Sequence, residues 1–350
     1  MTTGWQGIKQ VLKYPAIRAG LEASALAVRL PGVACVGGRG LIFTMHHVEP
    51  SGARHAFDPN AGLIITPDFL EQAIVTVLKA GLVPVHAHDL PALLSDPSDQ
   101  RRFVSFTLDD GYRNNARYAA PVFERYGVPF TIFPTIDFIK RSRSLWWETA
   151  EVLLRNANVF HIDFGNGEEP VRTVSVREKY VAYRRLVNFV KTCDEDEAVR
   201  RIDAAARAQA IEPLDITDNL IMNTDEIGAL GESPHVHFGG HTLTHVNLRR
   251  VSNDRLDAEI TGSIIGIEAL SGKRPRSFAY PYGWHEAVSR REANAVSTHG
   301  FVIGVTTRPG MLDQSVMQQP ALLPRVSLNG LYQKPRYVRA LISGLPFKLT

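Results

Sequence analysis

The sequence has few cysteines and no long apolar run. Its two cysteines, Cys35 and Cys193, lie far apart and form no Cys-x-x-Cys pair. This count excludes a disulfide framework and a thiolate metal site, so both residues are expected to be free thiols. No stretch approaches the roughly 20 apolar residues that span a bilayer. Charged residues interrupt the apolar N-terminus, which argues against a signal peptide, and we expect a cytoplasmic protein.

The chain also lacks a strong excess of either charge. Its formal net charge is +3 over 350 residues, and the basic residues are spread along the sequence. This pattern argues against a nucleic-acid partner. The composition, 44% hydrophobic and 21% charged, is that of a soluble globular enzyme. It indicates no oligomeric state.

Periodicity divides the chain into three parts. Residues 1–39 form an N-terminal extension, expected to be helical in two pieces around Pro15 and to pack on the domain. The alternative is a helix that lies on a membrane surface, giving peripheral membrane association. Residues 40–330 alternate β-rich runs with helical patterns, which predicts a parallel sheet or barrel. A helical insertion is expected at about 140–224, with helices at 177–191 and 195–210, and residues 331–350 form a C-terminal tail.

Two adjacent aspartates are the most informative feature. Asp109 and Asp110 follow the apolar segment 102–108, expected to be a strand, and precede Gly111. Neighbouring carboxylates repel one another unless a cation lies beside them. One aspartate is therefore predicted to bind a metal while the other handles a proton.

A histidine pair supplies further metal-ligand candidates. His241 and His245 are four residues apart, a spacing expected to place them on one face of a helical turn. They follow Gly239-Gly240, directly after an expected strand at 235–238, and barrel enzymes place their active sites at such strand ends. Asp110, His241 and His245 together form a two-histidine, one-carboxylate set that suits a divalent metal.

The third motif runs from Phe278 to Gly283, again where an expected strand meets a turn. Pro281 and Gly283 bracket Tyr282 and hold its backbone N–H in a defined turn, where it can face a developing oxyanion. The alternative is a proline-stiffened loop with aromatic residues in the core.

These motifs, in this order, resemble those of the NodB-type polysaccharide deacetylases. The resemblance rests on T-L-D-D-G, H-T-L-T-H and Y-P-Y-G and runs from about residue 41 to 328; M-H-H-V, L-W-W-E and L-P-R-V resemble landmarks of the Y-P-Y-G branch. It implies an α/β fold, a distorted (β/α) barrel. The implied activity is metal-dependent hydrolysis of the N-acetyl group of a chitooligosaccharide-like substrate, an N-acetylated poly- or oligosaccharide, which releases acetate.

The resemblance also implies roles for individual residues. Asp109 is the general base, and Asp110, His241 and His245 hold the metal, which is Zn²⁺, with Co²⁺ or another divalent ion as alternatives. The backbone N–H of Tyr282 stabilises the oxyanion. Four further residues are expected to contact the substrate: Trp147, Tyr280, Pro281 and Arg325. The alternative for Trp147 is that it packs in the core.

The sequence departs from the family pattern at two functional positions. Ala279 stands where many members have an arginine that orients the base. Arg325 stands about where many members have a histidine that protonates the leaving amine, and arginine does not readily donate a proton. We therefore predict that His46, at the end of the first strand, is the general acid, with His47, His285 or a metal-bound water as alternatives.

Two other functions stay open from the sequence. Relatives of this fold hydrolyse other non-peptide C–N bonds, including cyclic amides. The missing arginine and the uncertain acid are also compatible with a carbohydrate-binding pseudoenzyme.

Overall fold

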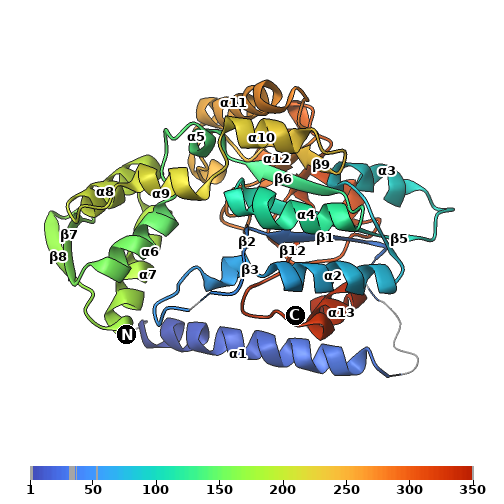
Figure 1. Cartoon of the computed structure of the whole chain (residues 1–350), viewed down its shortest axis with the longest axis horizontal. Helices are drawn as coiled ribbons and strands as arrows, with labels where there is room; N and C mark the ends of the chain where they lie inside the picture. Colours follow the sequence, from blue (N-terminus) through green and yellow to red (C-terminus); the bar gives the residue numbers. More distant parts are fainter. Residues whose placement is uncertain (1–2, 31–35, 37, 53, 349–350) are drawn as a thin grey trace.

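The computed structural model describes residues 3–30, 36, 38–52 and 54–348, with side chains from residue 14 onward. Cys35 lies outside the described residues, and Cys193 is a free thiol. Within the described chain, parallel strands form a main sheet in the order β12–β1–β5–β6–β9, and β4 pairs with the start of β5 (Figure 1). These strands are β1 Gly40–Met45, β4 Leu82–Pro84, β5 Arg102–Asp110, β6 Phe130–Pro134, β9 Val236–Phe238 and β12 Val326–Ser327.

Two shorter strands continue this pairing. β10 (Ser277–Ala279) and β11 (Ile303–Val305) form a parallel pair. Isolated parallel bridges join Gly240 to Phe278 and Val305 to Leu323. Strand pairing therefore runs from β9 through β10 and β11 to the segment before β12, an arrangement consistent with the expected distorted (β/α) barrel. A separate parallel pair is formed by β2 (His47–Val48) and β3 (Ile64–Ile65).

Alternating side chains of β1 divide the core between the two faces of the sheet. Leu41 and Phe43 belong to the cluster that contains Ile74 and Val77 of the overlying helix α2. Ile42 belongs to a second cluster, formed with Phe133, Ala279, Ile303, Val305 and Leu323. Successive strand residues point to opposite faces, so β1 is buried on both, as expected in a sheet covered by helices.

Helices cover the sheet as the sequence predicts. In α2, Thr66 is the N-cap, its hydroxyl accepting a hydrogen bond from the Phe69 N–H at 3.1 Å, and Pro67 is the first helical residue. A π-turn, Asn115–Ala119, precedes α4, which has Pro121 in its first turn. The helices outside the insertion are α2 Pro67–Lys79, α3 Leu90–Ser95, α4 Ala120–Arg125, α5 Ile136–Ile139, α10 Thr224–Gly231, α11 Asn253–Ser271, α12 Arg290–Thr298 and α13 Pro335–Ser343.

The insertion forms the green-to-yellow lobe in Figure 1. It contains α6 Trp146–Asn156, α7 Val176–Thr192, α8 Glu195–Arg207 and α9 Pro213–Leu220, so the helices expected at 177–191 and 195–210 are present. The expectation of an all-helical insertion is corrected by an antiparallel hairpin, β7 Val159–Asp163 and β8 Glu168–Arg172. Exposed and buried residues alternate along β7, which is strand periodicity.

The N-terminal extension is one helix, α1 (Thr3–Ala27), where two pieces were expected. Pro15 lies inside this helix, although proline cannot donate the backbone hydrogen bond of a helix interior. Glu22 accepts hydrogen bonds from Arg336 at 2.8 and 2.6 Å, so α1 is anchored to the C-terminal helix α13 (Figure 1).

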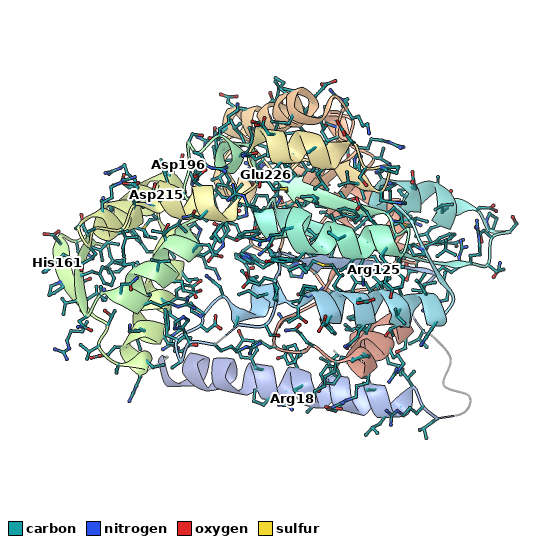
Figure 2. The ribbon with its side chains drawn as sticks, viewed as in Figure 1. Arg18, Arg125, His161, Asp196, Asp215 and Glu226 are labelled. Carbon is teal, nitrogen blue, oxygen red and sulfur yellow. The ribbon has the colours of Figure 1, made fainter. Side chains whose placement is uncertain are left out.

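Charged side chains lie on the outside of several elements, among them Arg18 on α1 and Glu226 on α10 (Figure 2). Among the described helices, none combines the length and apolar character needed to cross a bilayer. Cytoplasmic location and peripheral membrane contact of α1 stay predictions.

The fold predicts that Gly239 tolerates no side chain. A Cβ at this position would lie 2.3 Å from the Phe133 ring and 2.7 Å from the Ser277 carbonyl oxygen. We expect Gly239→Ala to lower the free energy of unfolding by roughly 1–3 kcal/mol through overpacking. Chemical denaturation measures this change.

Gly228→Ala is the matched control, since a Cβ there meets nothing within 4 Å inside helix α10. It should stabilise the protein by roughly 0.5–1 kcal/mol. Equal effects of the two substitutions would contradict the close packing at Gly239.

Candidate active site

Parallel strands deliver the predicted metal ligands to one edge of the sheet. Asp109 and Asp110 are the last two residues of β5. After β9, the N–H of Gly239 bonds to β6 and that of Gly240 bonds to the Ser277 carbonyl, and His241 follows. Because parallel strands end at the same edge, these side chains meet although more than 100 residues separate them in sequence.

Asp110, His241 and His245 converge on one point. The Oδ1 atom of Asp110 lies 3.4 Å from Nε2 of each histidine, and all three residues are buried. Ligands about 2.1 Å from a tetrahedral Zn²⁺ are about 3.4 Å apart, so this spacing fits a divalent metal. Asp110 Oδ1 is buried without a hydrogen-bond partner among the described residues, as expected for an oxygen that binds a cation.

The charges in this set favour an ionised ligand. Burial raises the pKa of Asp110, but its interactions with the imidazoles of His241 and His245 outweigh burial and hold that pKa well below its usual value. The set therefore offers an ionised carboxylate beside two imidazoles, which bind metal when neutral.

A backbone carbonyl orients His241. Its Nδ1 lies 2.7 Å from the carbonyl oxygen of Ala279, which can only accept a hydrogen bond. Nδ1 therefore carries the proton, and Nε2 is left free to bind a metal.

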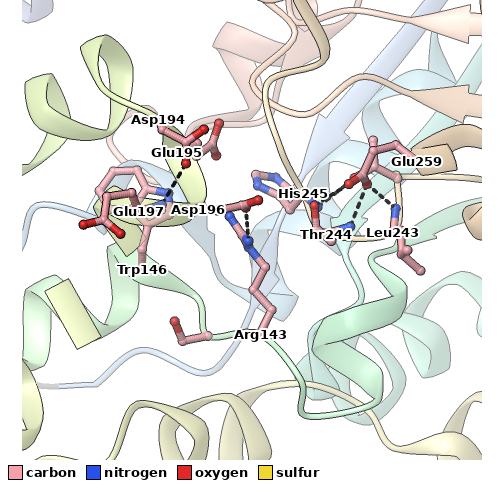
Figure 3. Close-up of polar contacts among 12 residues, drawn as sticks. Arg143, Trp146, Asp194, Glu195, Asp196, Glu197, Leu243, Thr244, His245 and Glu259 are labelled. Atoms are coloured by element: carbon pink, nitrogen blue, oxygen red, sulfur yellow. Dashed lines mark hydrogen bonds and ion pairs between the residues drawn. The ribbon is translucent and has the colours of Figure 1, made fainter. Parts of the chain in front are cut away.

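The histidine motif is a loop, which corrects the expected helical turn. Thr242 and His245 have φ of 65° and 61°, in the left-handed region. Glu259 of α11 holds the loop, since its Oε2 accepts from the N–H groups of Leu243 and Thr244, both at 2.9 Å (Figure 3). A buried carboxylate replaces the helical hydrogen bonds, so the two histidines meet without a helix.

Backbone strain is concentrated at this site. Six described non-glycine residues have positive φ, and four of them are Asp110 (69°), Thr242, His245 and Tyr282 (64°). Such conformations cost about 1–3 kcal/mol each and persist where surrounding contacts hold them.

Arg325 supplies the arginine that the Ala279 position lacks. Its Nη1 and Nη2 donate to Oδ1 and Oδ2 of Asp109, both at 2.7 Å, and Nη1 also donates to Thr107 Oγ1 at 3.1 Å. Nε donates to the carbonyl of Thr306 at 2.9 Å. The guanidinium is buried with these partners, so Arg325 is not open to the substrate contact predicted for it and instead holds the Asp109 carboxylate.

This pair keeps Asp109 ionised. Burial raises the pKa of Asp109, but the charge and hydrogen bonds of Arg325 outweigh it, and the net pKa lies below the usual value. A carboxylate held ionised beside a metal site is suited to accept a proton from an attacking water.

Tyr282 joins the turn to the insertion. Its hydroxyl donates to Glu195 Oε1 at 2.6 Å and accepts from Trp146 Nε1 at 3.1 Å. The Thr307 hydroxyl donates a hydrogen bond to the Tyr282 carbonyl oxygen at 2.8 Å. Among the described residues, none accepts a hydrogen bond from the backbone N–H of Tyr282, which is what an oxyanion donor requires.

Comparison with known proteins gives a family match over part of the chain and a shared fold over most of it. A family model described as polysaccharide deacetylase matches residues 215–301. The resemblance to the polysaccharide deacetylases is confirmed. No curated protein matches the chain.

Solved structures share the polysaccharide deacetylase fold. The Streptococcus pyogenes deacetylase PplD in complex with acetate has a TM-score of 0.55 at 14% identity, over 84% of this chain and 94% of that chain. IcaB from Ammonifex degensii has a TM-score of 0.53 at 15% identity, over 89% and 98%. A polysaccharide deacetylase from Bacillus cereus has a TM-score of 0.52 at 13% identity, over 87% and 69%.

The other expected substrate contacts lie inside the polysaccharide deacetylase fold. The Tyr280 hydroxyl donates to the Ala321 carbonyl at 2.8 Å, and both Tyr280 and Pro281 are buried. The Trp147 ring lies 5.0 Å from the His245 ring, and its Nε1 donates to the Tyr112 hydroxyl at 2.9 Å. Trp147 therefore packs against His245 and offers no open stacking platform, while Tyr280 is a core residue.

The three histidines considered as the general acid lie in different places relative to the aspartates. Met45 of β1 pairs with Leu108 of β5, so His46 and the aspartates follow at the same end of neighbouring strands. Burial lowers the pKa of His46, against the opposing charges of Asp110 and Asp109. His47 faces away, with Nε2 3.2 Å from Glu148 Oε1. His285 is exposed. His46 is the candidate that the fold brings to the aspartate pair.

Sequence reasoning missed Glu259 and Glu195. Glu259 lies three residues after Leu256, so it falls on the apolar face of α11 that Ile260 and Ile264 continue. A charged residue on the apolar face of a helix predicts a buried side chain with polar partners. Glu195 begins α8 and reaches Tyr282 only through tertiary folding, so no local signal marks it.

Replacing Glu259 by glutamine should loosen the metal site. The glutamine amide presents N–H donors where backbone N–H groups need an acceptor. We expect Glu259→Gln to weaken metal binding by about 10–100-fold, as for other residues that support ligands. Competition with a chromophoric chelator measures the affinity. Glu268→Gln, on an exposed turn of the same helix, is the control and should change nothing.

Removing Arg325 should reverse the pH dependence of stability that Asp109 contributes. With its pKa lowered, Asp109 stabilises the wild-type fold above its unfolded pKa of 3.8, and this stability is lost as pH falls through the folded pKa. In Arg325→Met, burial without a cation should raise the pKa of Asp109 above its unfolded value. The variant should then gain stability, relative to wild type, as pH falls from neutral.

Denaturation at several pH values and a carboxyl NMR titration of Asp109 measure these changes. Arg325→Lys keeps the charge without the two-pronged contact and should lie between the other two proteins. An unchanged Asp109 pKa in Arg325→Met would contradict the positioning role.

Proposed function

We propose that the protein is a metal-dependent N-deacetylase of an N-acetylated poly- or oligosaccharide, chitooligosaccharide-like in type, and that it releases acetate. The observation that carries this proposal is the pair of neighbouring carboxylates with different partners. Asp110 faces His241 and His245, while Asp109 is paired with Arg325.

Asp110, His241 and His245 would hold the metal. Their ligand spacing and nitrogen-oxygen donor set suit Zn²⁺, with Co²⁺ or another divalent ion as alternatives. When bound, the metal would act as a Lewis acid on the acetamide carbonyl.

Asp109 would accept the proton of the attacking water. Arg325 keeps its carboxylate ionised and fixes both oxygens, so the base is aligned before the substrate arrives. The backbone N–H of Tyr282 would donate to the oxyanion that develops on the carbonyl oxygen.

His46 would then protonate the leaving amine. Its lowered pKa makes the imidazole largely neutral at neutral pH, so it must gain a proton within the reaction before it donates one. Asp109, which has just accepted a proton, is the neighbouring source.

Acetate release tests the proposal. Wild-type protein with one equivalent of Zn²⁺ or Co²⁺ should release acetate from N-acetylglucosamine oligomers, and removal of the metal should abolish this. Asp109→Asn should lower turnover by roughly 10²–10⁴-fold, the usual contribution of a general base, while still binding one metal per chain. An enzyme-coupled acetate assay and elemental analysis measure the two quantities.

Each failure has a distinct meaning. Full activity in Asp109→Asn would sink its role as base, and full activity in His46→Asn would do the same for the acid. Release of product from small cyclic amides alone would favour another C–N hydrolase. Saccharide binding without acetate release at full metal loading would favour a pseudoenzyme.

A further inference from the structure

A cavity of about 360 Å³ lies beside the candidate active site. His47 lines it, and the His47 ring lies 3.6 Å from the ring of Tyr112, whose hydroxyl bonds Trp147. The Trp147 ring in turn lies 5.0 Å from the His245 ring, so a continuous run of aromatic contacts joins the cavity to the predicted metal ligands. Its volume falls in the range of small-ligand pockets, roughly 300–1,000 Å³.

The cavity contains an unsatisfied buried carboxylate oxygen. Glu151 is 6% exposed, and its Oε2 has no hydrogen-bond partner among the described residues. Its Oε1 pairs with Arg155. A buried acceptor without a donor is costly, so Glu151 Oε2 marks a place where a ligand donor is missing.

A second carboxylate stands one helical turn away. Glu148 is three residues before Glu151 on α6, so both lie on the same face. Glu148 Oε1 accepts from the Tyr112 hydroxyl at 3.2 Å, which fixes its position. Burial and the charge of Glu148 raise the pKa of Glu151 to about 7, and a cation placed between them would relieve this repulsion.

Negative charge dominates the lining. Four carboxylates face two guanidinium groups there: Glu49, Asp58, Glu148 and Glu151 against Arg54 and Arg155. Arg155 is already shared by Glu151 and Asp58, the latter at 3.7 Å. The cavity therefore suits a ligand that brings a positive charge and N–H donors.

We propose that this cavity is a subsite for a sugar unit with a free ammonium group, next in the chain to the unit that is deacetylated. This rests on the proposed function, because deacetylation converts acetamido sugars into such units. The enzyme would then favour partly deacetylated chains and act beside units that it has already processed.

Binding without turnover tests this subsite. Isothermal titration of the metal-loaded protein should show tighter binding of a β-1,4-linked glucosamine disaccharide than of the N-acetylglucosamine disaccharide. Glu151→Gln should weaken the glucosamine disaccharide by about tenfold, the loss of one charge-assisted hydrogen bond, and leave the acetylated one unchanged.

Arg155→Gln is the matched variant. It removes the same ion pair as Glu151→Gln but keeps the carboxylate, so it should bind the glucosamine disaccharide at least as tightly as wild type. A purely structural ion pair would instead make both variants weaken both ligands alike, and that result overturns the proposal.

Equal affinity of the wild-type protein for the two disaccharides would also overturn the subsite proposal. Unchanged binding of the glucosamine disaccharide by Glu151→Gln would do the same, provided that the thermal midpoint shows this variant to be folded. The titration needs no hydrolysis. Ammonium-selective binding without acetate release would therefore overturn the deacetylase proposal and leave the subsite standing.

Discussion

Two adjacent carboxylates buried at the end of one strand set the constraint on which the site depends. An uncompensated buried charge costs several kcal/mol, and two of them side by side repel as well. The fold provides a separate partner for each carboxylate. Arg325 donates two hydrogen bonds to Asp109, and His241 and His245 face Asp110. This separation is what the proposed roles require, with Asp109 as the base and Asp110 as a metal ligand.

The backbone around the two aspartates is strained by this arrangement. Left-handed residues at Asp110, Thr242, His245 and Tyr282 aim side chains that regular strands and helices would direct elsewhere. Buried side chains hold them in place, above all Glu259, which satisfies two N–H groups of the histidine loop. Such support from rigid elements is what keeps metal ligands aligned before a metal binds.

The insertion contributes side chains to the candidate active site in addition to its exposed helices. Through Trp146 and Glu195 it holds the Tyr282 hydroxyl, and through Trp147 it packs against His245. Its helix α6 also carries Glu148 and Glu151 to the neighbouring cavity. One short helix thus links the metal ligands to the surface proposed to select the adjoining sugar unit.

The sequence by itself determined the local features: the apolar strands, the helices of the insertion and the aspartate and histidine motifs. Each of these depends on neighbours a few residues apart, and periodicity records them. Only the tertiary structure decided that Arg325 takes the place of the arginine absent at Ala279, since it meets Asp109 across 216 residues. It also decided that the histidines meet through a loop and that Tyr280 is core, because a side chain's partners depend on which strands lie side by side, and sequence spacing does not record that.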